Sequence, residues 1–312
     1  MTASILSAPH FHNEEAAYEF VQSRLWPDNK PVCPRCGGYE RTGKLAGKST
    51  RIGVHKCYDC RKPFTVKVGT IFEDSHIPLR LWLQAIFLIA SSKKGISSNQ
   101  LHRTLGVTLK SAWFMSHRVR EAMRAGKLGP LGGEGKAVEA DETYIGGKEK
   151  NKHASKRNAG NIGGQGKQVV FSLVERGGQV LSDHVPDVTG ATLAPILREQ
   201  IKQETTLMTD EAGQYRNVGK EFAAHETVNH GIGEYVRGGA HSNTIEGYFS
   251  ILKRGIVGTY HHVSAKHLKR YLAEFDFRYN NRVKLGCDDV QRAERLLEGV
   301  IGKRLTYQTT SP

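Results

Sequence analysis

Long hydrophobic runs are missing from this sequence. The most apolar stretch, Leu81 to Ala90, is too short to cross a bilayer, so we expect no membrane segment. The N-terminus also lacks a basic region followed by an apolar one, the pattern of a secretory signal. We therefore predict a protein of the cytoplasm, associated with the nucleoid if its partner is DNA.

Acidic residues are in short supply. Asp and Glu number 31 against 45 Lys and Arg, which gives a net charge of +14. Such an excess favours a polyanionic partner through counterion release and long-range steering. Nucleic acid is the leading candidate, and a merely basic soluble protein is the alternative. The 312 residues, 38% of them hydrophobic, suffice for two or three globular domains.

Cysteine is scarce too, but four of the five cysteines form two C-x2-C pairs with twenty residues between the pairs: Cys33 and Cys36, then Cys57 and Cys60. Four thiolates in this pattern suit tetrahedral Zn²⁺ with a structural role. Disulfides and a redox C-x-x-C are the alternatives, and a cytoplasmic compartment argues against the first. We expect strands at Thr50 to Val54 and at Pro63 to Val68, and an ordinary thiol at Cys287.

Helical patterns surround this metal site. Glu14 to Trp26 reads as an amphipathic helix ended by Pro27, and Pro78 to Ala90 reads as an apolar one. A helix from Ser97 or Ser98, a turn at Gly106 and a helix from Thr108 to Met123 match a helix-turn-helix. Its second helix would present Lys110, Ser111 and His117 or Arg118 to DNA. A plain three-helix bundle is the alternative.

The second half of the chain alternates strand and helix patterns. Ala137 to Ile145 has the period of a strand, with Glu139 and Asp141 on one face and Val138 and Ala140 on the other. Further elements are expected in this order: a hairpin of Gln168 to Val174 and Gln179 to Val185, a helix from Thr192 to Lys202, a strand from Thr206 to Asp210, a helical stretch from Ala212 to Phe222, a strand from Glu226 to Val228, and a helix from Val263 to Asn281. This order describes an α/β domain of the RNase H-like type.

A basic insertion separates the first two of these strands. Lys148 to Lys167 holds six Lys or Arg and one acid, without apolar periodicity. We predict a mobile loop that binds DNA phosphates without reading sequence. The side chains expected to do so are Lys148, Lys150, Lys152, Lys156 and Arg157.

Three acids stand at informative places: Asp141 in the first strand, Asp210 at the end of a later strand, and Glu246 in the stretch that runs from His241 to Arg254. If that stretch is helical, Asn243, Glu246, Ser250 and Lys253 share one polar face beside an apolar stripe. Carboxylates that converge from different elements can hold two divalent ions for phosphoryl chemistry. The alternative is that Asn243 and Glu246 form only a capping box and the aspartates are ordinary surface acids.

These residues resemble the DDE transposases of bacterial insertion sequences that carry an N-terminal zinc ribbon, the ISXO-like group. The resemblance covers nearly the whole chain. It rests on Cys33-Pro34-Arg35-Cys36, on Val138 through Gly147, on Asp210, and on His241 through Lys253.

The resemblance implies hydrolytic nicking at element ends and attack of the freed 3′-hydroxyl on target DNA. Asp141, Asp210 and Glu246 would hold Mg²⁺, for which Mn²⁺ can substitute, and Lys253 with Arg254 would contact the DNA end. Members of the group are described with Asn in place of the third acid, so Asn243 competes with Glu246, which ranks first on charge and on its seven-residue spacing to Lys253. The partners implied are double-stranded DNA, as terminal inverted repeats and target, and further copies of the chain assembled on DNA.

The expected domains are an N-terminal helix and zinc ribbon (1–68), a helix-turn-helix-like region (69–125), a glycine-rich linker (126–135), the RNase H-like catalytic domain (136–283) and a C-terminal helical tail (284–312). Two other functions fit part of the pattern. A DNA-binding regulator needs only the ribbon and the helix-turn-helix, and a cellular RNase H-like nuclease or junction resolvase needs only the carboxylates.

Overall fold

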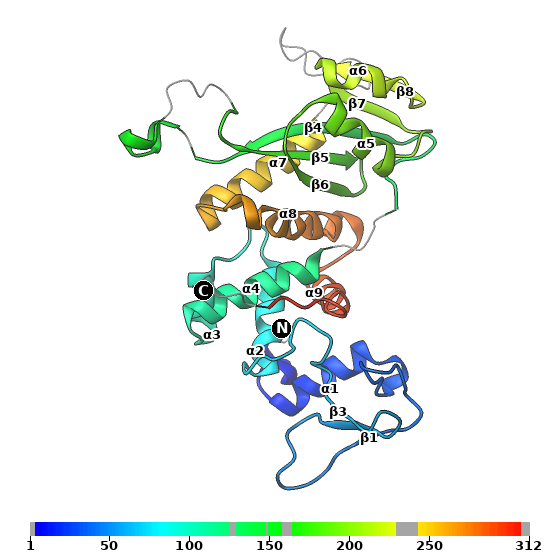
Figure 1. Ribbon diagram of the computed structural model, residues 1–312, viewed down its shortest axis with the longest axis vertical. Coiled ribbons are helices and arrows are strands. Elements are labelled where there is room, and N and C mark those ends of the chain that lie inside the picture. The colour runs from blue at the N-terminus through cyan, green and yellow to red at the C-terminus, as the bar shows by residue number, and fades with distance from the viewer. Residues whose placement is uncertain (1–3, 125–128, 148, 158–163, 229–242, 307–312) are drawn as a thin grey trace. The chain divides into compact units, whose positions relative to one another are not determined.

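The chain folds into two compact units (Figure 1). Unit 1 comprises Met1–Ala125 and Gly286–Pro312, and unit 2 comprises Gly126–Leu285. The computed structural model describes residues 4–124, 129–147, 149–157, 164–228 and 243–306. No helix within those ranges is long and apolar enough to cross a membrane. The C-terminal residues from Gly286 on thus share a unit with the N-terminal part of the chain.

Unit 1 contains a small antiparallel sheet of β1 (Thr42–Lys44), β2 (His55–Cys57) and β3 (Pro63–Phe64). The rings of Trp26, His55 and Phe64 pack against one another, with the centroids of Trp26 and His55 4.9 Å apart. The strand expected at residues 50–54 is wrong, and the one expected at 63–68 is shorter. Gly53 has a left-handed φ of 69° and lies against the Tyr18 ring, so the backbone turns before β2 can begin.

The helices of unit 1 are α1 (Glu14–Leu25), α2 (Leu79–Ser91), α3 (Ser98–Leu105), α4 (Leu109–Met123) and α9 (Asp289–Glu298). Asn13, Ser97 and Thr108 cap the first, third and fourth of these by accepting from a backbone N–H. Gly106, with φ of 67°, ends α3. The helices on both sides of the predicted helix-turn-helix turn are therefore confirmed.

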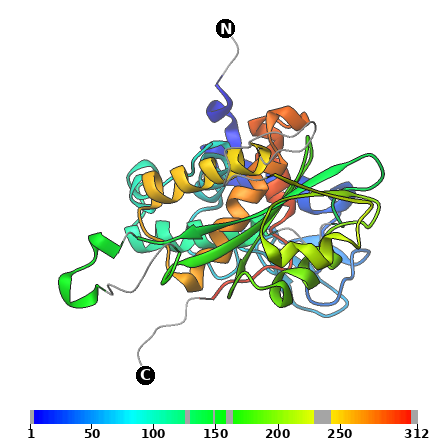
Figure 2. The ribbon, with the colours of Figure 1, turned by 90° about the horizontal axis from the view of Figure 1, so that it is seen from above.

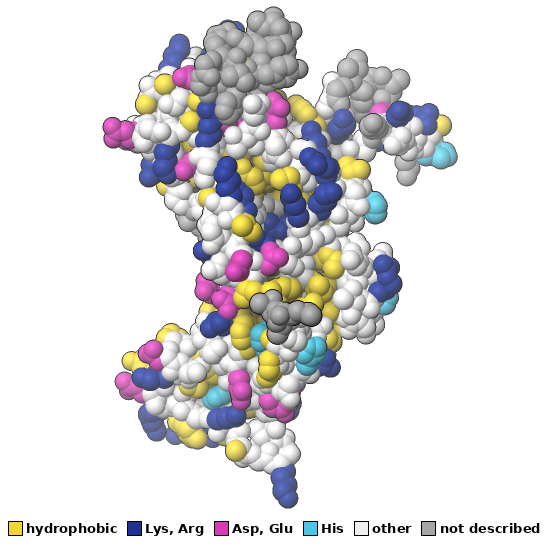
Figure 3. All heavy atoms as spheres, turned by 180° about the vertical axis from the view of Figure 1, so that it is seen from behind, with side chains coloured by type: hydrophobic (Ala, Val, Ile, Leu, Met, Phe, Trp, Pro, Cys, Tyr) yellow, Lys and Arg dark blue, Asp and Glu magenta, His cyan; other side chains and the backbone are white. Residues whose placement is uncertain are grey.

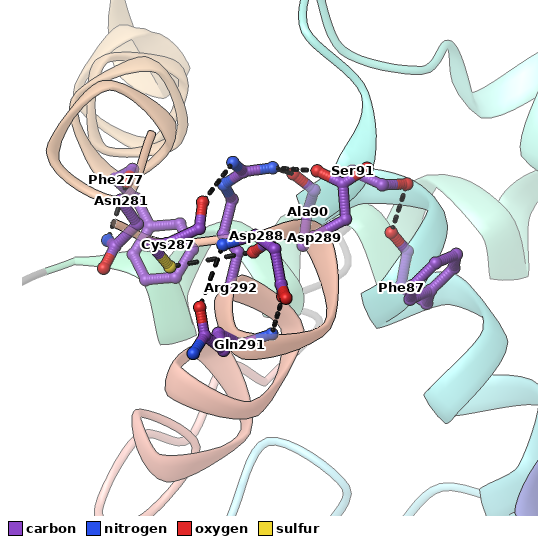
Figure 4. Close-up of polar contacts among 10 residues, drawn as sticks. All are labelled: Phe87, Ala90, Ser91, Phe277, Asn281, Cys287, Asp288, Asp289, Gln291 and Arg292. Carbon is purple, nitrogen blue, oxygen red and sulfur yellow. Dashed lines mark hydrogen bonds and ion pairs between the residues drawn. The ribbon is translucent and has the colours of Figure 1, made fainter. Parts of the chain in front are cut away.

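Residues at the start of helix α9 attach it to the end of helix α2 (Figure 4). Asp288 and Gln291 form a capping box, and the Arg292 guanidinium donates to the carbonyl oxygens of Ala90 and Cys287. Cys287, expected to be an ordinary thiol, is buried. The end of α2 and the start of α9 are thus joined by one buried guanidinium.

Unit 2 is built on a five-stranded sheet in the order β6-β5-β4-β7-β8. The strands are β4 (Ala137–Ile145), β5 (Gln168–Glu175), β6 (Val180–Val185), β7 (Thr206–Asp210) and β8 (Ala224–Val228). Strands β4, β5 and β6 pair antiparallel, whereas β7 pairs parallel with both β4 and β8. Three antiparallel strands followed by two parallel ones on the far side of the first are the RNase H-like arrangement, as predicted.

Helices cover both faces of this sheet (Figures 1 and 2). Helix α5 (Gly190–Gln200) packs on one face, with Leu193 and Leu197 against Val138 and Ala140 of β4. Helices α7 (Asn243–Gly255) and α8 (Ala265–Asn280) pack on the other. The alternation predicted for β4 thus divides its residues between two separate cores.

The helical stretch predicted from Ala212 to Phe222 is only partly formed. It consists of a short 3-10 turn, η6 (Gly213–Tyr215), and the single turn of α6 (Arg216–Gly219). Two glycines in the run weaken a longer helix, and Gly219 packs so closely on His225 that no side chain would fit. The other elements predicted for this unit are confirmed to within a few residues.

A buried carboxylate joins three elements of unit 2. Asp276 of α8 accepts hydrogen bonds from the Ser182 backbone N–H (2.8 Å), the Ser182 hydroxyl (2.8 Å) and the Tyr248 hydroxyl (2.5 Å). Burial raises the pKa of Asp276 to about 7, against the lowering effect of these donors. One side chain therefore fixes β6 and the middle of α7 to α8.

We predict that Asp276→Ala destabilises unit 2 by about 2–4 kcal/mol, because it removes the acceptor that the Tyr248 hydroxyl and the Ser182 backbone N–H share. The measurement is the urea midpoint. Glu226→Ala, at an exposed site on β8, is the control and should change stability by less than about 0.5 kcal/mol. Equal midpoints for the two variants would contradict the prediction.

Candidate active site

Two of the three predicted acids lie on neighbouring parallel strands. The printed pairing of β4 with β7 ends at Glu139 and Met208, and Asp141 and Asp210 each follow two residues later on their own strand. Both aspartates are half-buried. Asp141 accepts from the Glu142 backbone N–H at 2.7 Å, and Asp210 accepts from the Ala212 N–H at 3.1 Å.

The third acid, Glu246, is exposed in the first turn of α7, on the face of the sheet toward which Asp141 points. Burial raises the pKa of Asp141 to about 7, and the nearby charges of Glu142, Asp210 and Glu246 add to this rise, while the Glu142 N–H opposes it. Asp210 and Glu246 therefore both lie close enough for their charges to act on Asp141. The three acids are not packed as tightly as the cysteines, the one group of three or more potential ligands among the described residues with all ligand atoms within 4.8 Å.

Glu142 also belongs to this site, although the sequence analysis does not predict it as a site residue. It lies on the α5 face of β4, and its Oε1 accepts from Gln214 Nε2 at 2.9 Å. Burial raises the pKa of Glu142, the Tyr215 and Gln214 side chains lower it, and the charge of Asp210 raises it. The sequence does contain an indication of this residue. Glu142 follows Val138 and Ala140 on one face of the strand, where the alternation predicts an apolar residue.

Glu139 lies on the same face of β4 as Asp141, as the alternation predicts, and the sequence indicates no function for it. Its side chain is fully buried and accepts from the backbone N–H groups of Thr244 (3.0 Å) and Ile245 (2.9 Å) at the start of α7. Its other oxygen pairs with Arg176 Nε at 2.7 Å. The first turn of α7 is thus capped from β4, an arrangement that the capping-box alternative for Asn243 and Glu246 did not foresee.

The two faces predicted for α7 are present. Ile245, Tyr248, Phe249 and Leu252 are buried, whereas Asn243, Glu246 and Lys253 are exposed and Ser250 is half-buried. Arg254 is exposed and donates to the Ser250 hydroxyl. His241 and Ser242 lie outside the described residues.

The predicted DNA-facing side chains of α4 divide into two groups. Lys110 is exposed and Ser111 is half-buried. His117 and Arg118 are buried, and the Arg118 guanidinium donates to the carbonyl oxygens of Ile71, Glu73 and Leu305. A DNA contact through Arg118 is therefore a wrong prediction, because unit 1 itself encloses the group. Helix α4 turns that residue inward in its third turn.

Only part of the basic insertion is described. Lys150 and Arg157 are exposed, Lys152 pairs with Glu149 at 2.6 Å, and Arg157 donates to the carbonyl oxygens of Lys150 and Lys152. Lys148 and the side chain of Lys156 fall outside the described residues. DNA contact by this insertion stays a prediction.

The four cysteines of unit 1 have the geometry of a zinc site. The Sγ atoms of Cys33 and Cys60 lie 3.7 Å apart, and those of Cys36 and Cys57 lie 3.6 Å apart. Tetrahedral Zn²⁺ with Zn–S bonds of about 2.3 Å requires sulfurs about 3.8 Å apart. The thiols therefore fit structural zinc, and the predicted zinc ribbon is confirmed.

The two units together define a zinc-ribbon protein with an RNase H-like domain that carries an acidic site. Comparisons with known proteins agree. Residues 130–280 match the family model of the ISXO2-like transposase domain, and residues 12–63 match that of the transposase zinc-ribbon domain. The chain belongs to the ISXO2-like transposase family with an N-terminal zinc ribbon, and it is a transposase.

The chain is similar to two further sequences and, more distantly, to a solved structure. Over 286 residues the chain is 31% identical to an uncharacterized protein in transposable element ISH50 of Halobacterium salinarum, an alignment that covers 86% of this chain and 91% of that protein. It is 29% identical over 97 residues to an uncharacterized transposase-like protein of Haemophilus influenzae, covering 31% and 77% of the two chains. Among solved structures, the Mos1 strand transfer complex aligns over 69% of this chain and 72% of that chain, with 15% identity and a TM-score of 0.29.

We predict that Cys57→Ser abolishes zinc binding and unfolds the ribbon without unfolding unit 2, because metal ligation replaces an apolar core in the ribbon. Elemental analysis gives the zinc content, and hydrogen exchange distinguishes the two units. Cys287→Ser, which removes a buried thiol outside the cluster, should keep one zinc per chain. Full zinc content in Cys57→Ser would refute the assignment.

Proposed function

We propose that this transposase binds the ends of its element, nicks them by metal-dependent hydrolysis and joins the freed 3′-hydroxyl to target DNA. The observation that carries the proposal is that three acids from three elements come together: Asp141 of β4, Asp210 at the end of β7 and Glu246 in the first turn of α7, the last two near enough for their charges to act on Asp141. Acids that converge from two strands and a facing helix form a site that a cation can occupy.

The donor set fits Mg²⁺. Asp141, Asp210 and Glu246 offer hard carboxylate oxygens, and a divalent ion would offset the charges of Asp210 and Glu246 that act on Asp141. These three residues would hold Mg²⁺, with Mn²⁺ as a substitute. When bound, the metal would supply charge stabilisation to the attacking and leaving oxygens of a phosphodiester.

The remaining residues of the site would orient the DNA. Lys253 and Arg254 are exposed on the last turn of α7, seven and eight residues beyond Glu246 on the same helix, so they suit phosphates of the element end. Lys and Arg side chains also gather over the face of unit 2 that Figure 3 shows. In unit 1, Lys110 and Ser111 on α4 would contact the terminal inverted repeat, and the basic insertion would contact phosphates of any sequence.

Glu246 is the stronger candidate for the third ligand. Both Glu246 and Asn243 are exposed in the first turn of α7, but only the glutamate carries a charge, and that charge acts on Asp141. A carboxylate offsets the charge of divalent ions, whereas an amide offers one neutral oxygen.

Joining of two DNA ends to one target would also require more than one copy of the chain on DNA.

We predict that Glu246→Gln abolishes nicking and joining in Mg²⁺ while end binding persists, because the nearly isosteric change removes only the charge. Asn243→Ser should keep measurable cleavage. Gel assays on labelled end DNA measure cleavage, and mobility shift measures binding. An active Glu246→Gln beside an inactive Asn243→Ser would assign the metal site to the asparagine.

We predict that Mg²⁺ stabilises unit 2 more at pH 8 than at pH 5.5. The pKa of Asp141 is raised from 3.8 to about 7, so its ionised form is disfavoured in the fold and its contribution to stability falls as pH rises across that range. Mg²⁺ binds the ionised form and reverses this loss. Thermal unfolding with and without Mg²⁺ measures the difference, which Asp141→Asn should remove. A shift that is independent of pH, or retained in Asp141→Asn, would count against the site.

A further inference from the structure

We infer that Glu139 is a positioning residue, whose buried carboxylate sets the place of Glu246 relative to Asp141. This inference rests on the proposed function, in which those two acids hold the metal. It concerns a residue that touches neither metal nor DNA in that proposal.

Both carboxylate oxygens of Glu139 are used. Oε2 accepts from the Thr244 and Ile245 backbone N–H groups at 3.0 and 2.9 Å, and Oε1 accepts from Arg176 Nε at 2.7 Å. The first N–H groups of a helix have no partner inside the helix, and a negative charge there also interacts favourably with the helix dipole. The Glu139 side chain is 0% exposed, so in the folded chain these N–H groups bond to the carboxylate and not to solvent.

The place of Glu139 in the sequence makes this contact relevant to the site. It lies two residues before Asp141 on the same face of β4, and the N–H of Ile245 lies one residue before Glu246. One carboxylate therefore joins the strand of the first acid to the helix turn of the third. A misplacement of about 1 Å in a catalytic site can cost about 100-fold in rate, so this junction bears directly on activity.

Arg176 offsets the burial of the Glu139 charge and is itself fixed to β4, because its backbone N–H donates to the Ala137 carbonyl oxygen at 3.0 Å. The middle of α7 has a separate attachment through Tyr248 and Asp276. Loss of the Glu139 contact should therefore free the first turn of α7 while the rest of the helix stays packed. An effect of Glu139 on the position of Glu246 can therefore be measured separately from an effect on the folding of unit 2.

The test compares Glu139→Ala, Glu139→Gln and a matched control, Glu175→Ala, in the full chain. Glu175 ends the neighbouring strand β5, where its carboxylate also accepts a backbone N–H, from Gly132 at 2.9 Å, and pairs with a cation, Lys136 at 2.8 Å. It makes the same kinds of contact without reaching α7. Three quantities are measured: hydrogen exchange of the peptide that begins at Asn243, the Mn²⁺ concentration at half-maximal thermal stabilisation, and nicking of end DNA.

We expect Glu139→Ala to speed exchange in the first turn of α7 and to raise the half-saturating Mn²⁺ concentration by about tenfold, with nicking lowered by about 100-fold. Glu175→Ala should leave all three unchanged, whatever it costs in melting temperature. Glu139→Gln keeps an oxygen that can accept from both N–H groups, so it should restore exchange and Mn²⁺ response toward the wild type.

Two failures are distinguishable. If Glu139→Ala only lowers the melting temperature, with α7 exchange and Mn²⁺ response equal to those of Glu175→Ala, the positioning role is overturned and the proposed function stands. If the wild type neither nicks DNA nor responds to Mn²⁺ through Asp141, the proposed function fails. In that case hydrogen exchange in α7 is the remaining test of whether Glu139 holds the helix. Unchanged exchange in Glu139→Ala would then overturn the positioning role as well.

Discussion

The convergence of carboxylates on Asp141 is the constraint on which the candidate site of unit 2 depends. Burial raises the pKa of Asp141, and the charges of Glu142, Asp210 and Glu246 add to this rise. The pairing of β4 with β7 brings together the strands that carry Asp141 and Asp210, and Glu139 with the Tyr248–Asp276 contact fixes the helix of Glu246. A bound cation would offset the acidic charges that the fold holds near Asp141.

Different interactions stabilise the sheet of unit 2 and the ribbon of unit 1. Unit 2 has an apolar core on each face of a five-stranded sheet, and the residues of β4 alternate between them. The ribbon of unit 1 has strands of only two or three residues, so four thiolates around Zn²⁺ replace the apolar core that such strands cannot form. Helices α1, α2, α4 and α9 supply the apolar packing in the rest of that unit.

Local patterns predicted most of the fold, and long-range contacts account for the rest. The bounds of β4 and β7 follow from alternation and apolar runs, and α3 and α4 follow from their caps. The strand expected at residues 50–54 failed because Gly53 must turn beside Tyr18, a residue that is distant in sequence. Arg118 has the helical position of a surface cation, but carbonyl groups from residues 71, 73 and 305 enclose it. The alternation predicts the correct face for Glu139, yet its partners on α7 are more than a hundred residues away, and no sequence period reveals them.

The central claim is that the acids of unit 2 serve to cut and join DNA. Its most direct measurement is to incubate the purified chain with Mg²⁺, target DNA and duplexes that carry the element's flanking ends, and to follow both nicked and joined products. The account predicts 3′-end nicks and joined products from the wild type and neither from Asp141→Asn, with end binding retained in both. Binding without nicking in the wild type would indicate a regulator, nicking without joining would indicate a nuclease, and either result would contradict the account.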